Sequence, residues 1–483
     1  MADYEKDPNS PGYHRPEHAQ HEAHRELVRD VCAGTLRLRE KAATYLPKHT
    51  AEHADEWKLR IGRAVLFNVT LKTLDTLVGI AFKKEPQLGK DVPEATQLQL
   101  KDCDLAGTHW AVFLKLLFRD VMQDGLAGIL VDMPPALPEG ATLADEQAAG
   151  LRPYFVKYTA DQIVNWRTNE KGQLTLLVLE EESTEPVGAY GVGEVCRYRV
   201  LTPGAWEVWR EVEDENTKQK KLIPEVNPDG SPMKGTTLLP VIPFAPAYAR
   251  KDGVMQSAPP LLELANLNLR HFQDASDYST SLYVGSNPLM FFSGVSSDFK
   301  LESTGPYAYV KEQDPLAKAI YLEVSGAAYS AVSANLKDLI DQMQALVLSL
   351  RVSNFVQKTA TEDRQDALRE ESYLATAVRG LRDCTELALW FVALYSDRNA
   401  ITGGTVELGA DLDDVPMTSQ ELQVLHQSVA AGIHTKETVW KIEASAGVLP
   451  QDFDPKAEAA ALQAEKQAAM DAAAQAFNGG FVA

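Results

Sequence analysis

Four histidines near the N-terminus form the densest group of potential metal ligands in the chain: His14, His18, His21 and His24. His21 and His24 could share a helix face. However, His-Glu-Ala-His is one residue shorter than the HExxH spacing of zinc proteases, and no third ligand is evident. Because residues 1–25 are polar throughout, we interpret them as a solvated, partly disordered arm. The sequence predicts no metal site and no cofactor.

Other motifs that could support catalysis are incomplete. Gly89-Lys90 is followed by Asp91 and lacks the upstream glycine of a phosphate-binding P-loop. Gly294–Asp298 imitates a nucleophile elbow but has no final glycine. The glycines at 188, 191 and 193 lack the strand before them and the helix after them that a dinucleotide fingerprint needs, so they are read as a loop. We therefore predict that the protein is not an enzyme and has no catalytic residue.

The composition excludes some further classes. The chain has 483 residues, enough for two to four domains, and a formal net charge of −21. This charge argues against a broad nucleic-acid-gripping surface, which needs a basic face, but not against a protein that DNA slides past. The four cysteines form no CxxC motif, which favours free thiols in a reducing compartment. We expect no signal peptide and no membrane span, since Met1–Asn9 is polar and Leu387–Tyr395 is too short to span a membrane.

Long helices dominate the region from Ser257 to Tyr395. Their periodicity predicts helices over 257–283, 327–350 and about 362–395, with a kink at Gly380 in the third. The first helix is so rich in Asn, Asp, Ser and Thr that it is too polar for an ordinary core. A ring or bundle in which copies of the chain flank this helix would explain its polarity.

Short strands are predicted on both sides of the first long helix. A β-rich block lies at about 153–245, after helices over 26–46, 57–82 and 108–123 and a strand at 129–131. Between the first two long helices, strands are expected at Leu289–Phe292, Ala308–Val310 and Ile320–Leu322. This small module cannot hold a core alone and should borrow packing from neighbours. The predicted fold class is α+β.

Several stretches follow one another in an order that resembles a known family. They are Arg63–Thr70 with Gly79 and Phe82–Pro86, Gly128–Pro134, Arg152–Tyr154 with Gln162–Arg167, Pro259–Leu261 with Asn268, and Asn287–Pro288. Over about residues 40–450 the chain resembles the portal proteins of tailed bacteriophages, and among them a portal-like family first catalogued as a domain of unknown function. No single motif is diagnostic, but their order is fairly specific.

The resemblance implies a ring of about twelve copies at one capsid vertex. Double-stranded DNA would enter and leave through this ring. The implied partners are the terminase motor, the major capsid or scaffold protein and a tail adaptor, which places the protein in the virion and, during assembly, in the host cytoplasm. The implied parts are an N-terminal arm (1–25), a wing (26–256), stem helices (257–287 and 326–350), a clip (288–325), a tunnel loop (351–361), a wing helix with its return (362–410), a crown (411–460) and an alanine-rich tail (461–483).

A conduit should not hold DNA, so its wall should be neutral or acidic with few cations. The expected channel-lining residues are Lys337, Asp341, Gln344, Arg351 and Lys358. We expect the three cations among them to touch phosphates transiently; the alternative is that they are outward-facing surface charges. Two other functions remain open. One is a ring-forming virion component, such as an adaptor, that never encloses DNA. The other is an enzyme with an unfamiliar site near Asp132 or His109.

Overall fold

The computed structural model describes residues 3–134, 151–214, 218–237, 239–285, 289–294, 317–322, 326–351, 372–409 and short stretches between 426 and 467. The chain divides into two units, Met1–Val406 and Glu407–Ala483, and each is described by itself. The first unit mixes helices with antiparallel sheets, in agreement with the predicted α+β class.

The N-terminal part of the first unit is helical, but its helices are shorter than predicted. They are α1 (Asp3–Lys6), α2 (Pro16–Ala33), α3 (Thr35–Glu40), α4 (Ala42–Tyr45), α5 (Ala54–Arg63) and α6 (Val69–Ala81). The prediction of one helix over 57–82 is wrong. The chain becomes extended at Ala64, and α6 begins after Asn68, whose side-chain oxygen accepts a hydrogen bond of 2.9 Å from the amide of Leu71.

The predicted disordered arm over residues 1–25 is also wrong for residues 3–25. The helix α2 begins within this segment, and His18 and Arg25 are buried. The arm lies against a sheet, since the Arg15 amide and guanidinium donate to the carbonyl oxygens of Val164 and Trp166, at 3.0 and 2.7 Å. Polar groups therefore hold the arm against the sheet. For this reason its low hydrophobicity led to the wrong prediction of a disordered segment.

The buried His18 should make stability depend on pH. Burial lowers the pKa of its imidazole from 6.5 to about 4, and electrostatic interactions with Arg25 and His14 act in the same direction, against a weaker opposing effect of Asp161. As pH falls below 6.5 the unfolded chain takes up this proton first, so stability is lost between about pH 6.5 and 4. The contribution of His18 to the loss should be about 2 kcal/mol between pH 8 and 5.

Urea denaturation of wild type and His18→Gln at pH 8 and pH 5 measures this contribution. The variant should lose about 2 kcal/mol less stability than wild type over that interval. An equal loss in both proteins would contradict the assignment of this pH dependence to His18.

Two antiparallel sheets form the body of the first unit. The three-stranded sheet has the order β10-β2-β3, and the six-stranded sheet has the order β4-β5-β6-β7-β8 with β9 also paired to β7. The strands are β2 (Leu126–Asp132), β3 (Tyr154–Thr159), β4 (Ile163–Thr168), β5 (Leu174–Val187), β6 (Gly191–Thr202), β7 (Ala205–Glu213), β8 (Lys220–Pro224), β9 (Lys234–Thr236) and β10 (Phe244–Tyr248). The predicted β-rich block is thus confirmed, although β4, β8 and β9 were not predicted.

Apolar residues from both sheets meet in one core. Leu130 and Phe244 from the small sheet join Trp166 and Leu177 from the large sheet in the same buried cluster. Gly128 is required at this contact, because a Cβ atom there would lie 2.1 Å from the Phe244 ring. A second, smaller cluster covers the opposite face of the large sheet.

Helices cover the small sheet. α8 (Trp110–Asp124) packs on β2 and β3, and α13 (Tyr373–Ser396) packs on β10 and β2. The helix α13 is unbroken through Gly380, where a kink was predicted. This glycine allows close packing instead, since its Cβ would lie 2.5 Å from the Tyr248 carbonyl oxygen. Shorter elements are β1 (Gln87–Leu88), α7 (Glu94–Gln99), the 3-10 helices Leu100–Asp102 and Ala160–Gln162, and β13 (Val406–Glu407).

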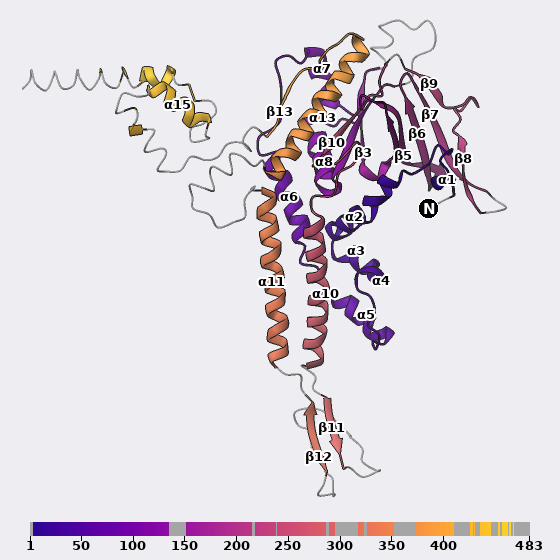
Figure 1. The fold of residues 1–483 in the computed structure, drawn as a ribbon, viewed down its shortest axis with the longest axis vertical. Coiled ribbons are helices and arrows are strands. Elements are labelled where there is room, and N and C mark those ends of the chain that lie inside the picture. Colours follow the sequence, from indigo (N-terminus) through magenta and orange to yellow (C-terminus); the bar gives the residue numbers. More distant parts are fainter. Residues whose placement is uncertain are drawn as a thin grey trace, which may run out of the picture. The chain divides into compact units, whose positions relative to one another are not determined.

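Two long helices lie side by side below this body in Figure 1 and are joined through a small hairpin. They are α10 (Leu262–Gly285) and α11 (Gly326–Arg351), and the hairpin consists of β11 (Leu289–Ser293) and β12 (Lys318–Leu322). These elements match the predicted helices and the outer two predicted strands within a few residues. The predicted strand Ala308–Val310 lies outside the described residues.

The second unit is described only in part. Its helix α15 (Lys436–Ser445) carries Trp440, whose ring contacts Phe453 edge-on at 5.8 Å, and the buried Glu443, which pairs with His426 at 3.0 Å. Most of the predicted crown (411–460) and tail (461–483), and the whole predicted tunnel loop after Arg351, lie outside the described residues.

Candidate functional site

The pair of long helices is the site to which the sequence assigns function, and α11 carries most of the predicted residues. Lys337, Asp341 and Gln344 are exposed, whereas Leu339 and Met343 are buried. The exposed three are spaced by four and three residues, so they share one side of the helix, opposite the buried pair. The structure therefore brings these three together. It does not test whether they line a channel.

The other two predicted site residues cannot be placed with them. Arg351 is the last residue of α11 and its side chain is not described, and Lys358 lies outside the described residues. Their assignment to a channel wall stays a prediction.

The polarity of α10 has a different cause from the one that the sequence suggested. Asn268 is fully buried and bonds to α6 and the segment before it, through Thr70 and the carbonyl oxygen of Phe67. Gln273 donates to the Tyr45 carbonyl oxygen at 2.9 Å. The premise that α10 is too polar to pack within one chain is therefore wrong for these positions, because its polar groups bond to neighbouring helices.

Asp277 extends the same pattern toward α5. Its carboxylate accepts from Arg60 at 3.3 Å and lies 3.2 Å from the ring nitrogen of His49. The guanidinium of Arg60 also binds Glu52 at 2.8 Å. These residues line a groove of about 540 Å³ between α5 and α10. Its buried cation, Arg60, is already paired with Glu52.

Polar contacts also join α10 to α11. Asp274 accepts from Asn335 at 3.0 Å and from Arg270 at 3.0 Å, and the Tyr329 hydroxyl donates to the Ser281 carbonyl oxygen at 3.1 Å. On the outer side of α11, by contrast, the side chains are exposed. The helix pair is thus fixed to the body mainly through α10, with smaller contacts of α11 to α6 and α13, and one side of α11 is exposed.

In the described part of the chain, the hairpin that joins the two helices is a sheet of two strands. Phe291 and Ile320 face each other across β11 and β12, and each is 49% exposed. A two-stranded hairpin alone is at most marginally stable in water. Phe291 and Ile320 thus form an exposed apolar pair on the hairpin.

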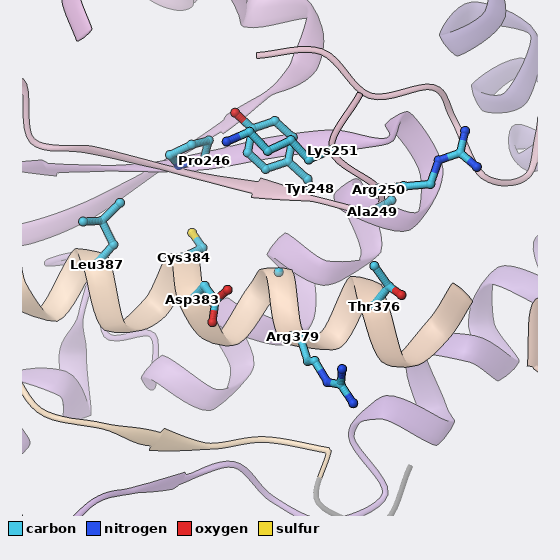
Figure 2. Close-up of a pocket in the computed structure, with 11 residues that line it drawn as sticks. Pro246, Tyr248, Ala249, Arg250, Lys251, Thr376, Arg379, Asp383, Cys384 and Leu387 are labelled. Atoms are coloured by element: carbon cyan, nitrogen blue, oxygen red, sulfur yellow. The ribbon is translucent and has the colours of Figure 1, made fainter. Parts of the chain in front are cut away.

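A second groove lies between β10 and α13 and has a volume of about 420 Å³. Its lining includes Arg250, Lys251 and Arg379. Figure 2 shows the guanidinium groups of Arg250 and Arg379 extending in different directions. The Lys251 ammonium lies 5.5 Å from the centre of the Tyr248 ring. The cations therefore do not converge on one ligand position.

The residues that an unfamiliar enzyme site would use have structural partners. Asp132 pairs with Arg199 at 2.8 Å and accepts from the Tyr154 hydroxyl, and the imidazole of His109 accepts from the Ala111 amide at the start of α8. Among the described residues, no three or more His, Cys, Asp or Glu side chains are placed to hold a metal ion. Within the same residues, no helix is long and apolar enough to cross a membrane.

Comparison with known proteins identifies one matching family over the helix pair. Residues 260–396 match the family model of a domain of unknown function, DUF4055. The match includes α10, the hairpin, α11 and α13 and leaves out the N-terminal helices and most of the sheets. It covers less than half of the chain, so it does not extend the family to the whole protein. No curated protein matches the chain.

The similar solved structures include two chains from gene transfer agent particles. A chain from the neck of an empty gene transfer agent particle is 13% identical, with 79% of this chain and 90% of that chain covered and a TM-score of 0.36. A chain from the virion of a native gene transfer agent particle is 12% identical, with the same coverage and a TM-score of 0.38. Both TM-scores lie below 0.5, so these likenesses carry no conclusion about fold or function.

Sequence reasoning missed the residues that fix the helix pair to the body. Asn268 was named as a polar position of a long helix and as part of the family resemblance, and no bond to the N-terminal helices was predicted for it. Asn68, just before α6, is a common N-cap residue and could have signalled the helix start.

Proposed function

We propose that the protein is a portal-type component of a tailed-bacteriophage-like virion. About twelve copies would form a ring at one capsid vertex through which double-stranded DNA passes. The proposal includes no catalytic step, cofactor or metal. The packaging motor, the capsid or scaffold protein and a tail adaptor are its proposed partners.

The observation that carries the proposal is the exposed apolar pair Phe291 and Ile320 on a hairpin that has two strands among the described residues. Strands or side chains from neighbouring copies would cover this pair and add strands to the β11–β12 hairpin. Because both ends of the hairpin continue into α10 and α11, copies that meet at the hairpin would bring their helix pairs together. The family match over 260–396 includes this region and supports treating it as one functional part.

Electron microscopy of the purified full chain tests the proposal. We expect closed rings of about a dozen subunits with a central channel. A monomer or a closed dimer at micromolar concentration would contradict it. An adaptor-like ring without a DNA conduit is the second candidate, and packaging assays distinguish it from a portal.

Lys337 allows the conduit role to be tested separately from ring formation. If the exposed side of α11 faces DNA, Lys337→Glu removes one transient phosphate contact and adds a repulsive charge. We expect a change in DNA packaging or retention of about twofold to tenfold, with rings still visible by electron microscopy. Lys171→Glu, in the exposed turn between β4 and β5, is the matched control. Equal packaging by wild type and Lys337→Glu would reject this placement of α11.

A further inference from the structure

The hairpin formed by β5 and β6 extends beyond the sheet to which it belongs. β4 pairs with β5 only as far as Leu179, and β7 pairs with β6 only from Arg197 onward. From Glu182 to Cys196 the two strands pair with each other, and in the described part of the chain no third strand joins them. The projecting part of this hairpin, residues 182–196, therefore has two free edges.

The end of the β5–β6 hairpin, residues 186–192, is uncharged and exposed. Tyr190 is 100% exposed, Val192 69% and Val187 60%. A fully exposed tyrosine between two exposed valines is costly in water unless a partner covers them. We call residues 186–192 the hairpin tip.

Acidic side chains flank the hairpin tip on one face. Val192, Glu194 and Glu182 share that face, because Val192 is opposite Pro186, Glu194 opposite Thr184 and Glu182 opposite Cys196 in the strand register. Glu182 and Glu194 are exposed, and neither forms an ion pair with a described residue. On the other face, Glu185 is neutralised by Arg197 and Arg210.

An apolar surface with arginines at its margin lies at the segment between α5 and α6. Residues 64–67 are extended, so Ala64 and Leu66 point inward while Val65 and Phe67 are 65% and 57% exposed. Leu36 of α3, 72% exposed, lies beside this segment, since the neighbouring Thr35 hydroxyl accepts from the Leu66 amide. We call Leu36, Val65 and Phe67 the apolar patch.

Arginines flank the apolar patch. Arg39 donates to the Ala64 carbonyl oxygen at 2.7 Å, and the guanidinium of Arg63 lies 3.7 Å above the Tyr283 ring. Among the described residues, neither arginine is paired with a carboxylate. The patch is thus apolar with a basic margin, whereas the hairpin tip is apolar with an acidic margin.

We propose that the hairpin tip of one copy docks on the apolar patch of the next copy. The inference rests on the proposed ring and names the surfaces through which its subunits meet. Two different surfaces on each chain make a head-to-tail contact, and repeated head-to-tail contacts form a ring when the rotation from copy to copy closes. The opposite charges at the two margins favour this pairing and disfavour contact between two acidic tips.

Cross-linking between Tyr190→Cys and Val65→Cys tests the contact. The double variant under oxidation should give a covalent ladder of dimers, trimers and larger species on a denaturing gel, since each copy offers both cysteines. Each single variant should stay largely monomeric, which controls for the four native cysteines. Rings of wild type without a ladder in the double variant would overturn this inference alone. Absence of rings in wild type would overturn the proposed function itself.

Charge exchange gives an independent test. Tyr190→Asp should raise the protein concentration needed for half-maximal ring assembly by about tenfold or more. Ile401→Asp, at another fully exposed apolar position, should leave it unchanged. Arg63→Glu and Glu194→Arg should each weaken assembly by about twofold to fivefold, and their combination should recover most of the loss. Equal effects of Tyr190→Asp and Ile401→Asp would overturn the docking proposal.

Discussion

Replacing Arg29 by Met should lower the free energy of unfolding by about 3–5 kcal/mol. The Arg29 guanidinium donates to both carboxylate oxygens of Asp124, at 2.8 and 2.6 Å, and also to Asp161. The side chain of Asp124 is only 1% exposed, so removal of Arg29 leaves its charge buried and unpaired. This network joins α2 to the end of α8, and its loss should loosen the whole N-terminal layer.

The cost of Arg29→Met should depend on pH. Burial raises the pKa of Asp124 even with Arg29 beside it. Without the guanidinium that pKa rises further, and the carboxyl group can escape the penalty by binding a proton. Because the variant's folded state then binds a proton that the unfolded state releases, the difference from wild type should be largest near neutral pH and shrink toward pH 4.

Urea denaturation curves of three variants provide the measurement and its controls. Arg119→Met removes a pair with Asp75 that is exposed, and should cost no more than about 1 kcal/mol. Arg29→Met combined with Asp124→Leu removes both charges and should recover most of the lost stability. If Arg29→Met costs no more than Arg119→Met, the buried pair does not hold these helices together.

The central helices and the strands next to them could be predicted because local patterns specify them. The periodicity of Leu339 and Met343 placed α11, and a short apolar run between Pro288 and Gly294 placed β11. The exposed stripe of Lys337, Asp341 and Gln344 followed from the same periodicity. These features depend on spacing within one segment, and spacing can be read without knowledge of the rest of the chain.

Helices were predicted in the layer formed by residues 3–68, but its long-range packing could not be predicted, for the opposite reason. Its burial rests on polar contacts with residues more than a hundred positions away, such as Arg29 with Asp161 and Tyr4 with Tyr198. A hydrophobicity pattern treats such residues as solvated, so the arm was read as disordered. Long-range pairing of charges and hydroxyl groups has no local signature.

The interpretation of α10 illustrates the same limit at the candidate site. Its polar residues were correctly seen as unusual for a core helix, and copies of the chain were inferred to cover them. The structure shows that Asn268, Gln273 and Asp277 bond within the chain to the N-terminal helices. The proposal of neighbouring copies therefore rests on exposed apolar groups, namely the hairpin pair Phe291 and Ile320, and no longer on the polarity of α10.

Replacing Asn268 by Leu should lower the free energy of unfolding by about 3 kcal/mol. The Asn268 side-chain oxygen accepts from the Thr70 amide and hydroxyl, at 3.1 and 3.0 Å, and its nitrogen donates to the Phe67 carbonyl oxygen at 2.8 Å. Leucine fills a similar volume but leaves the buried amide and hydroxyl of Thr70 without their acceptor, while the Phe67 carbonyl oxygen keeps its bond from the Val69 amide. Each such group costs about 1–3 kcal/mol.

Asn335→Leu is the matched control, because Asn335 is exposed on α11 and makes one hydrogen bond to Asp274. It should change stability by about 0.5 kcal/mol or less. Hydrogen exchange gives a local reading of the same difference: the Thr70 amide should exchange faster in Asn268→Leu and at the wild-type rate in Asn335→Leu. Equal stabilities and equal exchange rates in the two variants would mean that Asn268 does not fix α10 to α6. In that case the helix pair would be held to the body by the Asp277 and Arg60 pair and by apolar packing around Phe272, which is fully buried in α10.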